Sequence, residues 1–424
     1  MISMSQGITL SNLELTRFFF AVILLLMSAH FVGYLFNKFN LPRVGGEILG
    51  GIILGPSLLG QFLPSVYVWI FQGFEAEGKL LSLVYNLGMI LLMFISGLEV
   101  QKTVTKDERK DITAIFLGST IIPFVSGLFA PNVFDFTPYL GIKNSMPALV
   151  IVIAIAASVT SIPVLSKIFI DLGIINTKFS KLILTTATLH DVVLWVALAI
   201  ATGIANGKTV AFANVAVPVV ITIAFFLVAL FVMPRALKIS EKSKYNLIIK
   251  SSTTGYSLFV CFLFVAIASL LDVNIIFGAL LAGVVFGIVT IDKYQDVKSH
   301  VKEISTGFFI PIYFAIVGLK IDLIHHFEPL FFVGFLLFTT IAEMMGSMLA
   351  ARYLRKDWFS TLNICVAMTT RGGPGIVLAT VAFDIGIINE VLFVTMVLVA
   401  IVTSILSGYW FRYVLSKGWE LIKS

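Results

Sequence analysis

The chain has 424 residues, of which 58% are hydrophobic and only 12% are Asp, Glu, Lys or Arg. Soluble domains carry about 25% charged residues, so this composition argues against a soluble enzyme, a disordered protein and a nucleic-acid-binding protein. The two cysteines, Cys261 and Cys365, lie in apolar runs and indicate neither a disulfide framework nor a thiolate metal site. The sequence predicts an all-α, multi-pass integral membrane protein without catalytic activity.

Thirteen segments are long and apolar enough to be transmembrane helices, which need about 20 predominantly apolar residues. The first starts too late and is too long for a signal peptide, so we expect it to be retained. The connections are short and leave no room for a soluble regulatory domain, so residues 1–424 are expected to form one transmembrane domain. The predicted spans are 17–36, 44–62, 80–100, 112–130, 147–170, 180–202, 212–233, 248–270, 273–290, 303–319, 328–350, 361–384 and 390–413.

The basic residues support this count, because cytoplasmic loops are enriched in Lys and Arg. With thirteen spans and the N-terminus outside, 22 of the 29 basic residues fall inside and 4 fall outside. One missed or invented helix would destroy this asymmetry. We therefore expect a cytoplasmic C-terminus, and we attribute the net charge of +6 to topology, with no nucleic-acid partner.

Two predicted spans are interrupted near the middle of the membrane. The fifth contains the polar stretch from Ser158 to Pro163, and the twelfth contains Thr369 to Gly375, with Gly372, Gly373 and Pro374 in succession. Proline removes a backbone donor and clashes with the preceding turn, so helices 5 and 12 are predicted to be discontinuous.

The spacing of the two interruptions predicts an inverted-topology repeat. They lie half a chain apart, and seven crossings separate them, so the two helices run in opposite directions. Spans 1–6 (about 17–202) would then match spans 8–13 (about 248–413), with a linker helix at about 212–233. Secondary transporters place their sites where such broken helices cross. The alternative is two unrelated kinks.

His190 and Asp191 lie halfway along the sixth predicted span, among threonines. A carboxylate at the middle of the membrane is costly and marks an ion or proton pathway. We predict that Asp191 binds a proton and a monovalent cation in turn. The alternatives are a structural carboxylate satisfied by neighbouring hydroxyls or by Arg371, and, for His190, a neutral ring bound to a backbone carbonyl or one that titrates during transport.

Arg371 and Glu343 are two further ionisable residues inside predicted spans. Arg371 is expected to offset the half-helix C-terminal dipoles at the crossing, or to pair with Asp191 or Glu343. Glu343 could neutralise Arg371, bind a cation or face a water-filled inner funnel. In the second span, Gly46 with Gly50, and Gly51 with Gly55, show the small-xxx-small spacing that lets helices pack closely.

The segment from Glu47 to Gly60 resembles the second-helix signature of the Kef/NapA branch of the cation:proton antiporters. Ile95 to Glu99, Ala157 to Pro163, His190-Asp191 and Gly318 to Asp322 follow in the order of that family. The resemblance implies thirteen helices, a dimerisation panel and a moving core domain that exchanges ions by elevator-like alternating access. It also implies a homodimer, and Thr160 and Ser161 as cation-coordinating candidates with His190 in the accessory position.

The chain departs from the family pattern at two positions. Electrogenic members carry two adjacent aspartates and electroneutral members Asn-Asp, where this chain has His190-Asp191. Many members have a lysine where this chain has Glu343, whereas Arg371 followed by glycine resembles the electroneutral exchangers. One obligatory aspartate favours 1:1 exchange, although a titrating His190 could add a proton.

The expected function is secondary-active exchange of Na⁺ or K⁺ for H⁺, without a cofactor, in the lipid bilayer of a bacterial inner membrane. One alternative is proton-coupled efflux of an organic solute, with Asp191 as the proton site. Another is a channel-like or sensory protein with an antiporter fold.

Overall fold

The computed structural model describes residues 10–39, 41–98, 106–205, 212–242, 246–271, 273–289 and 293–422. Within them the protein is helical throughout, with one isolated antiparallel bridge between Leu140 and Ile388 and no strand. The predicted all-α class is therefore confirmed for this part of the chain. The predicted end of the third span and Glu99 of the family motif lie outside the described residues.

Within the described residues, 11 helices are long and apolar enough to cross a membrane. Each coincides with a predicted span, so the protein is a multi-pass membrane protein. The predicted span 273–290 corresponds to a shorter apolar helix, Ile275–Ile288. The 11 helices are Asn12–Lys38, Glu77–Leu98, Glu108–Leu128, Met146–Asp171, Lys178–Ala205, Val220–Ser240, Thr253–Leu270, Val297–Leu319, Pro329–Tyr353, Trp358–Ile385 and Glu390–Ser416.

The predicted span 44–62 is wrong as a single helix. Helix α2 (Arg43–Leu54) ends at Gly55, which has an extended backbone, and the chain resumes as two short helices, α3 (Leu59–Phe62) and α4 (Pro64–Phe71). The physical reason is Pro56, which disfavours a helical conformation at the preceding residue.

The chain forms two compact units. Unit 1 comprises Met1–Leu92 and Glu303–His326. In it α2 packs against α1 (Asn12–Lys38) and against α16 (Ile310–Leu319). A Cβ at Gly46 would lie 2.7 Å from the Val32 carbonyl oxygen on α1, and a Cβ at Gly51 only 1.9 Å from that of Ala315 on α16. The predicted close packing of the glycine motif is therefore confirmed.

Two further helices and a π-helical turn complete the main elements of unit 1. They are α5 (Glu77–Leu98), whose last turns belong to unit 2, the π-helical turn η4 (Ser305–Phe309) before α16, and α17 (Leu323–His326).

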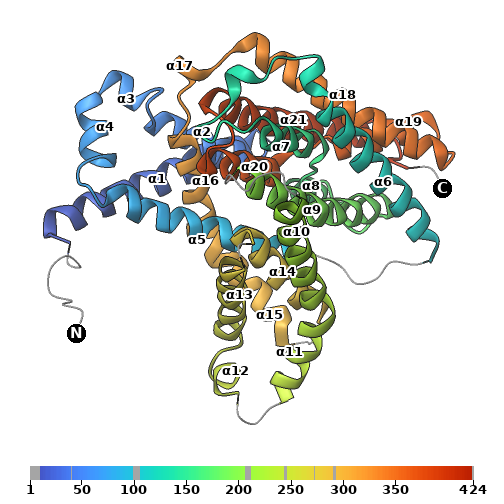
Figure 1. Cartoon of the computed structure of the whole chain (residues 1–424), viewed down its shortest axis with the longest axis horizontal. Helices are drawn as coiled ribbons and strands as arrows, with labels where there is room; N and C mark the ends of the chain where they lie inside the picture. The colour runs from blue at the N-terminus through green and yellow to red at the C-terminus, as the bar shows by residue number, and fades with distance from the viewer. Residues whose placement is uncertain are drawn as a thin grey trace. The chain divides into compact units, whose positions relative to one another are not determined.

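Unit 2 comprises Met93–Lys302 and Phe327–Ser424 and holds both interrupted helices. In it α13 and α14 lie side by side (Figure 1). Its helices are α6 (Lys106–Leu128), α7 (Met146–Ser158), α8 (Ile162–Asp171), α9 (Lys178–Ala205), α10 (Phe212–Leu227), α11 (Met233–Lys242), α12 (Leu247–Ser251), α13 (Thr253–Leu270), α14 (Ile275–Ile288), α15 (Lys293–Ile304), α18 (Pro329–Tyr353), α19 (Trp358–Met368), α20 (Gly372–Ile385) and α21 (Glu390–Ser416).

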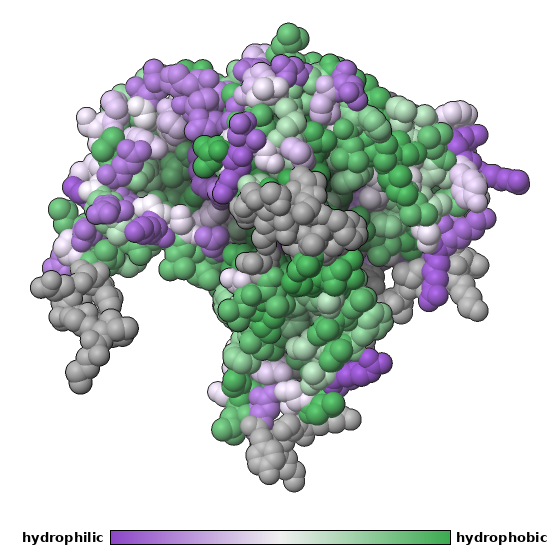
Figure 2. All heavy atoms as spheres, in the orientation of Figure 1, coloured by the Kyte–Doolittle hydropathy of each residue, from purple (hydrophilic) through white to green (hydrophobic). Residues whose placement is uncertain are grey.

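The surface of unit 2 over α10, α13 and α14 is mostly hydrophobic, and hydrophilic residues gather towards α11 and α12 (Figure 2). Large apolar side chains such as Val220 and Phe259 are exposed there. Contiguous apolar surface of this extent marks a membrane or protein interface.

Candidate functional site

The two interrupted helices of unit 2 break where the sequence places proline and glycine. Helix α7 ends at Ser158 and α8 begins at Ile162, with Val159 and Ser161 in extended conformations. Pro163 lies in the first turn of α8, where its missing N–H costs no helical hydrogen bond. On the other side, α19 ends at Met368 and α20 begins at Gly372.

Backbone and hydroxyl groups join the two interruptions directly. The N–H of Ser161 donates to the Thr370 carbonyl over 2.6 Å, and the Thr160 hydroxyl donates to the Met368 carbonyl over 2.7 Å. Gly372 has a φ of +38°, and a Cβ there would lie 2.5 Å from Ser161 Oγ. Glycine is therefore required at this crossing both for backbone conformation and for space.

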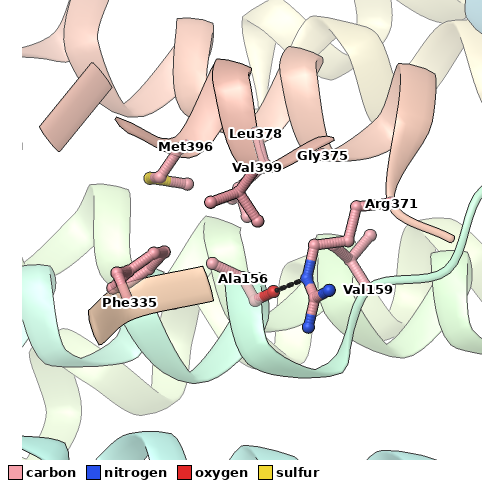
Figure 3. Close-up of a pocket in the computed structure, with 8 residues that line it drawn as sticks. All are labelled: Ala156, Val159, Phe335, Arg371, Gly375, Leu378, Met396 and Val399. Atoms are coloured by element: carbon pink, nitrogen blue, oxygen red, sulfur yellow. Dashed lines mark hydrogen bonds between the residues drawn. The ribbon is translucent and has the colours of Figure 1, made fainter. Parts of the chain in front are cut away.

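Arg371 lies at the centre of the crossing and is 3% exposed. Its Nε donates to the Ala156 carbonyl over 2.9 Å, as Figure 3 shows. The two terminal nitrogens donate to Ala157 over 3.4 Å and to Thr369 over 3.2 Å. These carbonyls belong to the C-terminal ends of α7 and α19, each of which carries about half a negative charge. The guanidinium thus lies where two helix dipoles end.

A small cavity borders Arg371 and is otherwise apolar, with Phe335, Leu378 and Met396 in its wall (Figure 3). Its volume of about 10 Å³ is room for about one water molecule. In this conformation it admits water and not an organic solute, since sites for such ligands measure hundreds of cubic ångströms.

Asp191 on α9 is 3% exposed, and neither of its carboxylate oxygens has a hydrogen-bond partner among the described residues. The alternatives in which hydroxyls or Arg371 satisfy this carboxylate therefore do not match the geometry. A buried carboxylate without a partner is costly unless it binds a proton or a cation.

His190, the preceding residue, is fully buried between two hydroxyl groups. Ser119 on α6 donates its proton to the Ile115 carbonyl over 2.6 Å, so its oxygen accepts from His190 Nε2 over 2.8 Å. Thr160 Oγ1 lies 3.3 Å from His190 Nδ1. Thr160 also donates its own proton, to Met368, so either ring nitrogen of His190 can donate to a hydroxyl oxygen. The ring also interacts with the backbone of Ser158 and Phe116, in agreement with the backbone-carbonyl alternative.

Ser119 is the residue that sequence reasoning missed. It lies in the apolar part of α6, and no motif distinguishes it from Ser126, which lies about two turns further along the same helix. Only the packing of α6 against α9 brings it to the ring of His190.

Ser161, the other predicted cation ligand, caps α8. Its side chain accepts from the Val164 N–H over 3.4 Å, and its backbone holds Thr370. Thr160 and Ser161 thus form hydrogen bonds with backbone groups at the crossing. Their hydroxyl oxygens keep lone pairs that can bind a further partner.

Glu343 on α18 is fully buried. Its Oε1 accepts only from the Ser347 hydroxyl, over 3.5 Å, and its Oε2 has no hydrogen-bond partner among the described residues. Arg371 therefore forms no hydrogen bond with Glu343 or Asp191, although the charges of Arg371 and Glu343 interact through space. Within the described residues no three His, Cys, Asp or Glu residues form a metal-binding group.

Residues 26–417 match the family model described as "Sodium/hydrogen exchanger, transmembrane". The chain is 31% identical over 413 residues to K(+)/H(+) antiporter 1 of Saccharomyces cerevisiae, covering 93% of this chain but 46% of that protein. The chain thus spans about half the length of that relative.

A bacterial relative and a solved structure match over nearly their whole lengths. The Na(+)/H(+)-K(+) antiporter GerN of Bacillus cereus is 25% identical over 398 residues, covering 94% of this chain and 96% of GerN. The sodium proton antiporter MjNhaP1 from Methanocaldococcus jannaschii shares the fold, with a TM-score of 0.68 and 14% identity over 95% of this chain and 97% of that one.

Proposed function

The chain belongs to the sodium/hydrogen exchanger family, and from that premise we propose that it exchanges a monovalent cation, Na⁺ or K⁺, for protons across the membrane. Asp191 is the shared site, protonated in one half of the cycle and cation-bound in the other. The observation that carries this proposal is the buried, unpartnered carboxylate of Asp191 beside two crossing helix breaks. The preceding residue, His190, contacts Thr160 at the first of these breaks.

The cation is expected to be held by Asp191 with hydroxyl oxygens of the interruption, from Thr160 and Ser161. Arg371 supplies a fixed positive charge against the ends of α7 and α19, so the crossing stays intact whether the site holds a proton or a cation. With one obligatory carboxylate we propose 1:1 exchange. Relatives from yeast and Bacillus cereus named as K⁺/H⁺ and Na⁺/H⁺-K⁺ antiporters support a monovalent cation.

The architecture proposed for this function has thirteen spans, an inverted repeat that contains the two broken helices, and elevator-like alternating access. The distribution of Lys and Arg supports an outside N-terminus and a cytoplasmic C-terminus. We further propose a homodimer in a bacterial inner membrane, with no enzymatic activity.

A second candidate function is proton-coupled efflux of an organic solute. The observation that favours it is the departure from the antiporter pattern at His190 and Glu343.

Proteoliposomes with a pH-sensitive dye separate the two functions. Reconstituted protein is given an imposed pH gradient, and Na⁺, K⁺, Li⁺ or Rb⁺ is added in turn. Cation exchange predicts that at least one of the four dissipates the gradient. If all four fail while the protein remains folded, the proposal is wrong.

A further inference from the structure

Unit 1 holds a second cluster of ionisable side chains, far in sequence from Asp191. Arg43 on α2 contacts His30 on α1, with 2.7 Å between a terminal guanidinium nitrogen and His30 Nδ1. The other ring nitrogen of His30, Nε2, lies 2.9 Å from the carbonyl oxygen of Gly307 in η4. Arg43 Nε lies 2.8 Å from Glu47 Oε1. The imidazole thus links α1 to both α2 and η4.

The cluster is built on the close contact between α1 and α2. A Cβ at Gly33 would lie 3.2 Å from Arg43 Cγ and 3.3 Å from Glu47 Cγ, so the glycine leaves the room in which both side chains cross α1. Glu47 is 4% exposed, and its ion pair orients the guanidinium towards His30.

The partners of His30 admit only one protonation state. A guanidinium donates and never accepts, so His30 Nδ1 must present a lone pair to Arg43. A carbonyl oxygen only accepts, so Nε2 must carry the proton that Gly307 receives. His30 is therefore neutral in this arrangement, as the Nε2–H tautomer. A second proton on Nδ1 would point an N–H at another N–H across 2.7 Å.

We propose that the hydrogen bonds of His30 link α1 to η4 in a protonation-dependent way. The link is present when the ring is neutral and is broken when the ring is protonated. Because the ion pair with Glu47 holds Arg43 in place, protonation of Nδ1 turns the ring away from the guanidinium and releases the Gly307 carbonyl. Because η4 is a π-helical turn at the start of α16, loss of this donor loosens the chain there. His30 is partly exposed, so its ring can exchange protons with water.

Of the ionisable groups nearby, Arg43 is the one that contacts the ring of His30 and decides its protonation state. Glu47 acts on the ring only through Arg43, which it holds in place. Tyr34 and Lys38 lie further along α1, Glu303 precedes η4, and on α16 Tyr313 packs against Tyr85 of α5. On the predicted topology this cluster faces the cytoplasm, so it would respond to the inner pH.

The test uses the full-length protein in lipid with ¹⁵N-labelled histidine, because the chain has only 5 histidines. The His30 signals are assigned as those that His30→Gln removes. At pH 8 we expect an unprotonated Nδ1 and a protonated Nε2. A ring protonated on Nδ1 at pH 8 would overturn the proposal.

Hydrogen–deuterium exchange of the backbone amides then measures whether the link between His30 and η4 is present. Between pH 8 and pH 6, after correction for the chemical exchange rate, wild-type amides of η4 and the first turn of α16 should exchange about tenfold faster. His30→Gln is the matched variant, because the glutamine oxygen can accept from Arg43 and the amide nitrogen can donate to Gly307, and neither group titrates. In this variant the protection of the same amides should not change with pH. His30→Arg should be unprotected at both pH values.

An equal change in wild type and His30→Gln would refute the inference. Neither measurement requires cation transport, so a negative result here is distinct from a failure of the proposed exchange.

Discussion

The backbone N–H of Ser161 donates to the carbonyl of Thr370 over 2.6 Å, and this bond joins the two helix interruptions of unit 2. Each break leaves backbone groups without intrahelical partners, which is costly in a membrane. Here each break supplies the partner that the other lacks.

Asp191→Asn should abolish exchange with every cation while leaving expression intact. The amide keeps the shape of the side chain but can neither take up a proton nor offset a cation's charge. Dye-monitored transport in proteoliposomes measures the effect. Asp135→Asn, in an exposed turn where the carboxylate accepts from the Thr137 N–H, is the control and should transport normally. Retained exchange in Asp191→Asn would remove Asp191 from the site.

Thr160→Val should lower the exchange rate at least tenfold, because the hydroxyl that holds the Met368 carbonyl is lost while side-chain volume is kept. Thr160→Ser retains the hydroxyl and should keep most of the activity. Initial rates at saturating cation measure both. A Thr160→Val variant as fast as Thr160→Ser would show that the hydroxyl is not required at this position.

Ser119→Ala should shift the pH profile of exchange, because His190 Nε2 loses the hydroxyl that contacts it. Ser126→Ala is the matched control: this serine lies on the same helix and donates to the carbonyl four residues earlier in the same way. Its profile should match wild type. A wild-type profile in Ser119→Ala, and likewise in His190→Ala, would favour a purely structural histidine.

Arg371→Ala should destabilise the protein strongly, since three carbonyls of two helix ends lose their donor. Hydrogen bonds to charged groups contribute about 1.5–3 kcal/mol each, so a large fall in melting temperature in detergent is expected. Arg371→Lys restores the charge but, with one nitrogen, reaches fewer of these carbonyls and should recover only part of the stability. A variant Arg371→Ala that melts and transports like wild type would contradict the dipole argument.

Gly51→Ala should destabilise unit 1, because the added Cβ would lie 1.9 Å from the Ala315 carbonyl oxygen and force α2 from α16. Gly78→Ala is the control, since a Cβ there meets nothing within 4 Å. Thermal unfolding of both variants gives the comparison. A Gly51→Ala protein as stable as Gly78→Ala would show that the two helices can separate without cost.

The sequence predicts those parts of the fold that depend on the conformational preferences of individual residues. A proline next to polar residues, as at Pro163, or next to consecutive glycines, as at Gly372-Gly373-Pro374, disfavours a continuous helix, so both interruptions were predictable. Arg371 was identified because a charge among apolar residues needs a reason. The end of α2 at Gly55 was mispredicted, because hydropathy alone does not reveal where a proline ends a helix.

What the sequence could not supply is the identity of partners across helices. Ser119 resembles Ser126 in every local respect, and only the packing of α6 on α9 brings it to His190. Likewise, nothing local tells that Arg371 donates to backbone carbonyls and not to Asp191 or Glu343. Side-chain partners in a helical membrane protein depend on helix rotation and depth, which composition does not encode.

The bond between Thr160 and Met368 spans 208 residues of sequence, and this has a consequence for biogenesis. While the ribosome is still synthesising the second half, the first interruption has no partner and exposes its backbone groups. The crossing of the two interruptions can therefore form only after α19 has entered the membrane. A nascent chain arrested before that point should contain inserted helices, but the backbone groups of its first break should lack these partners.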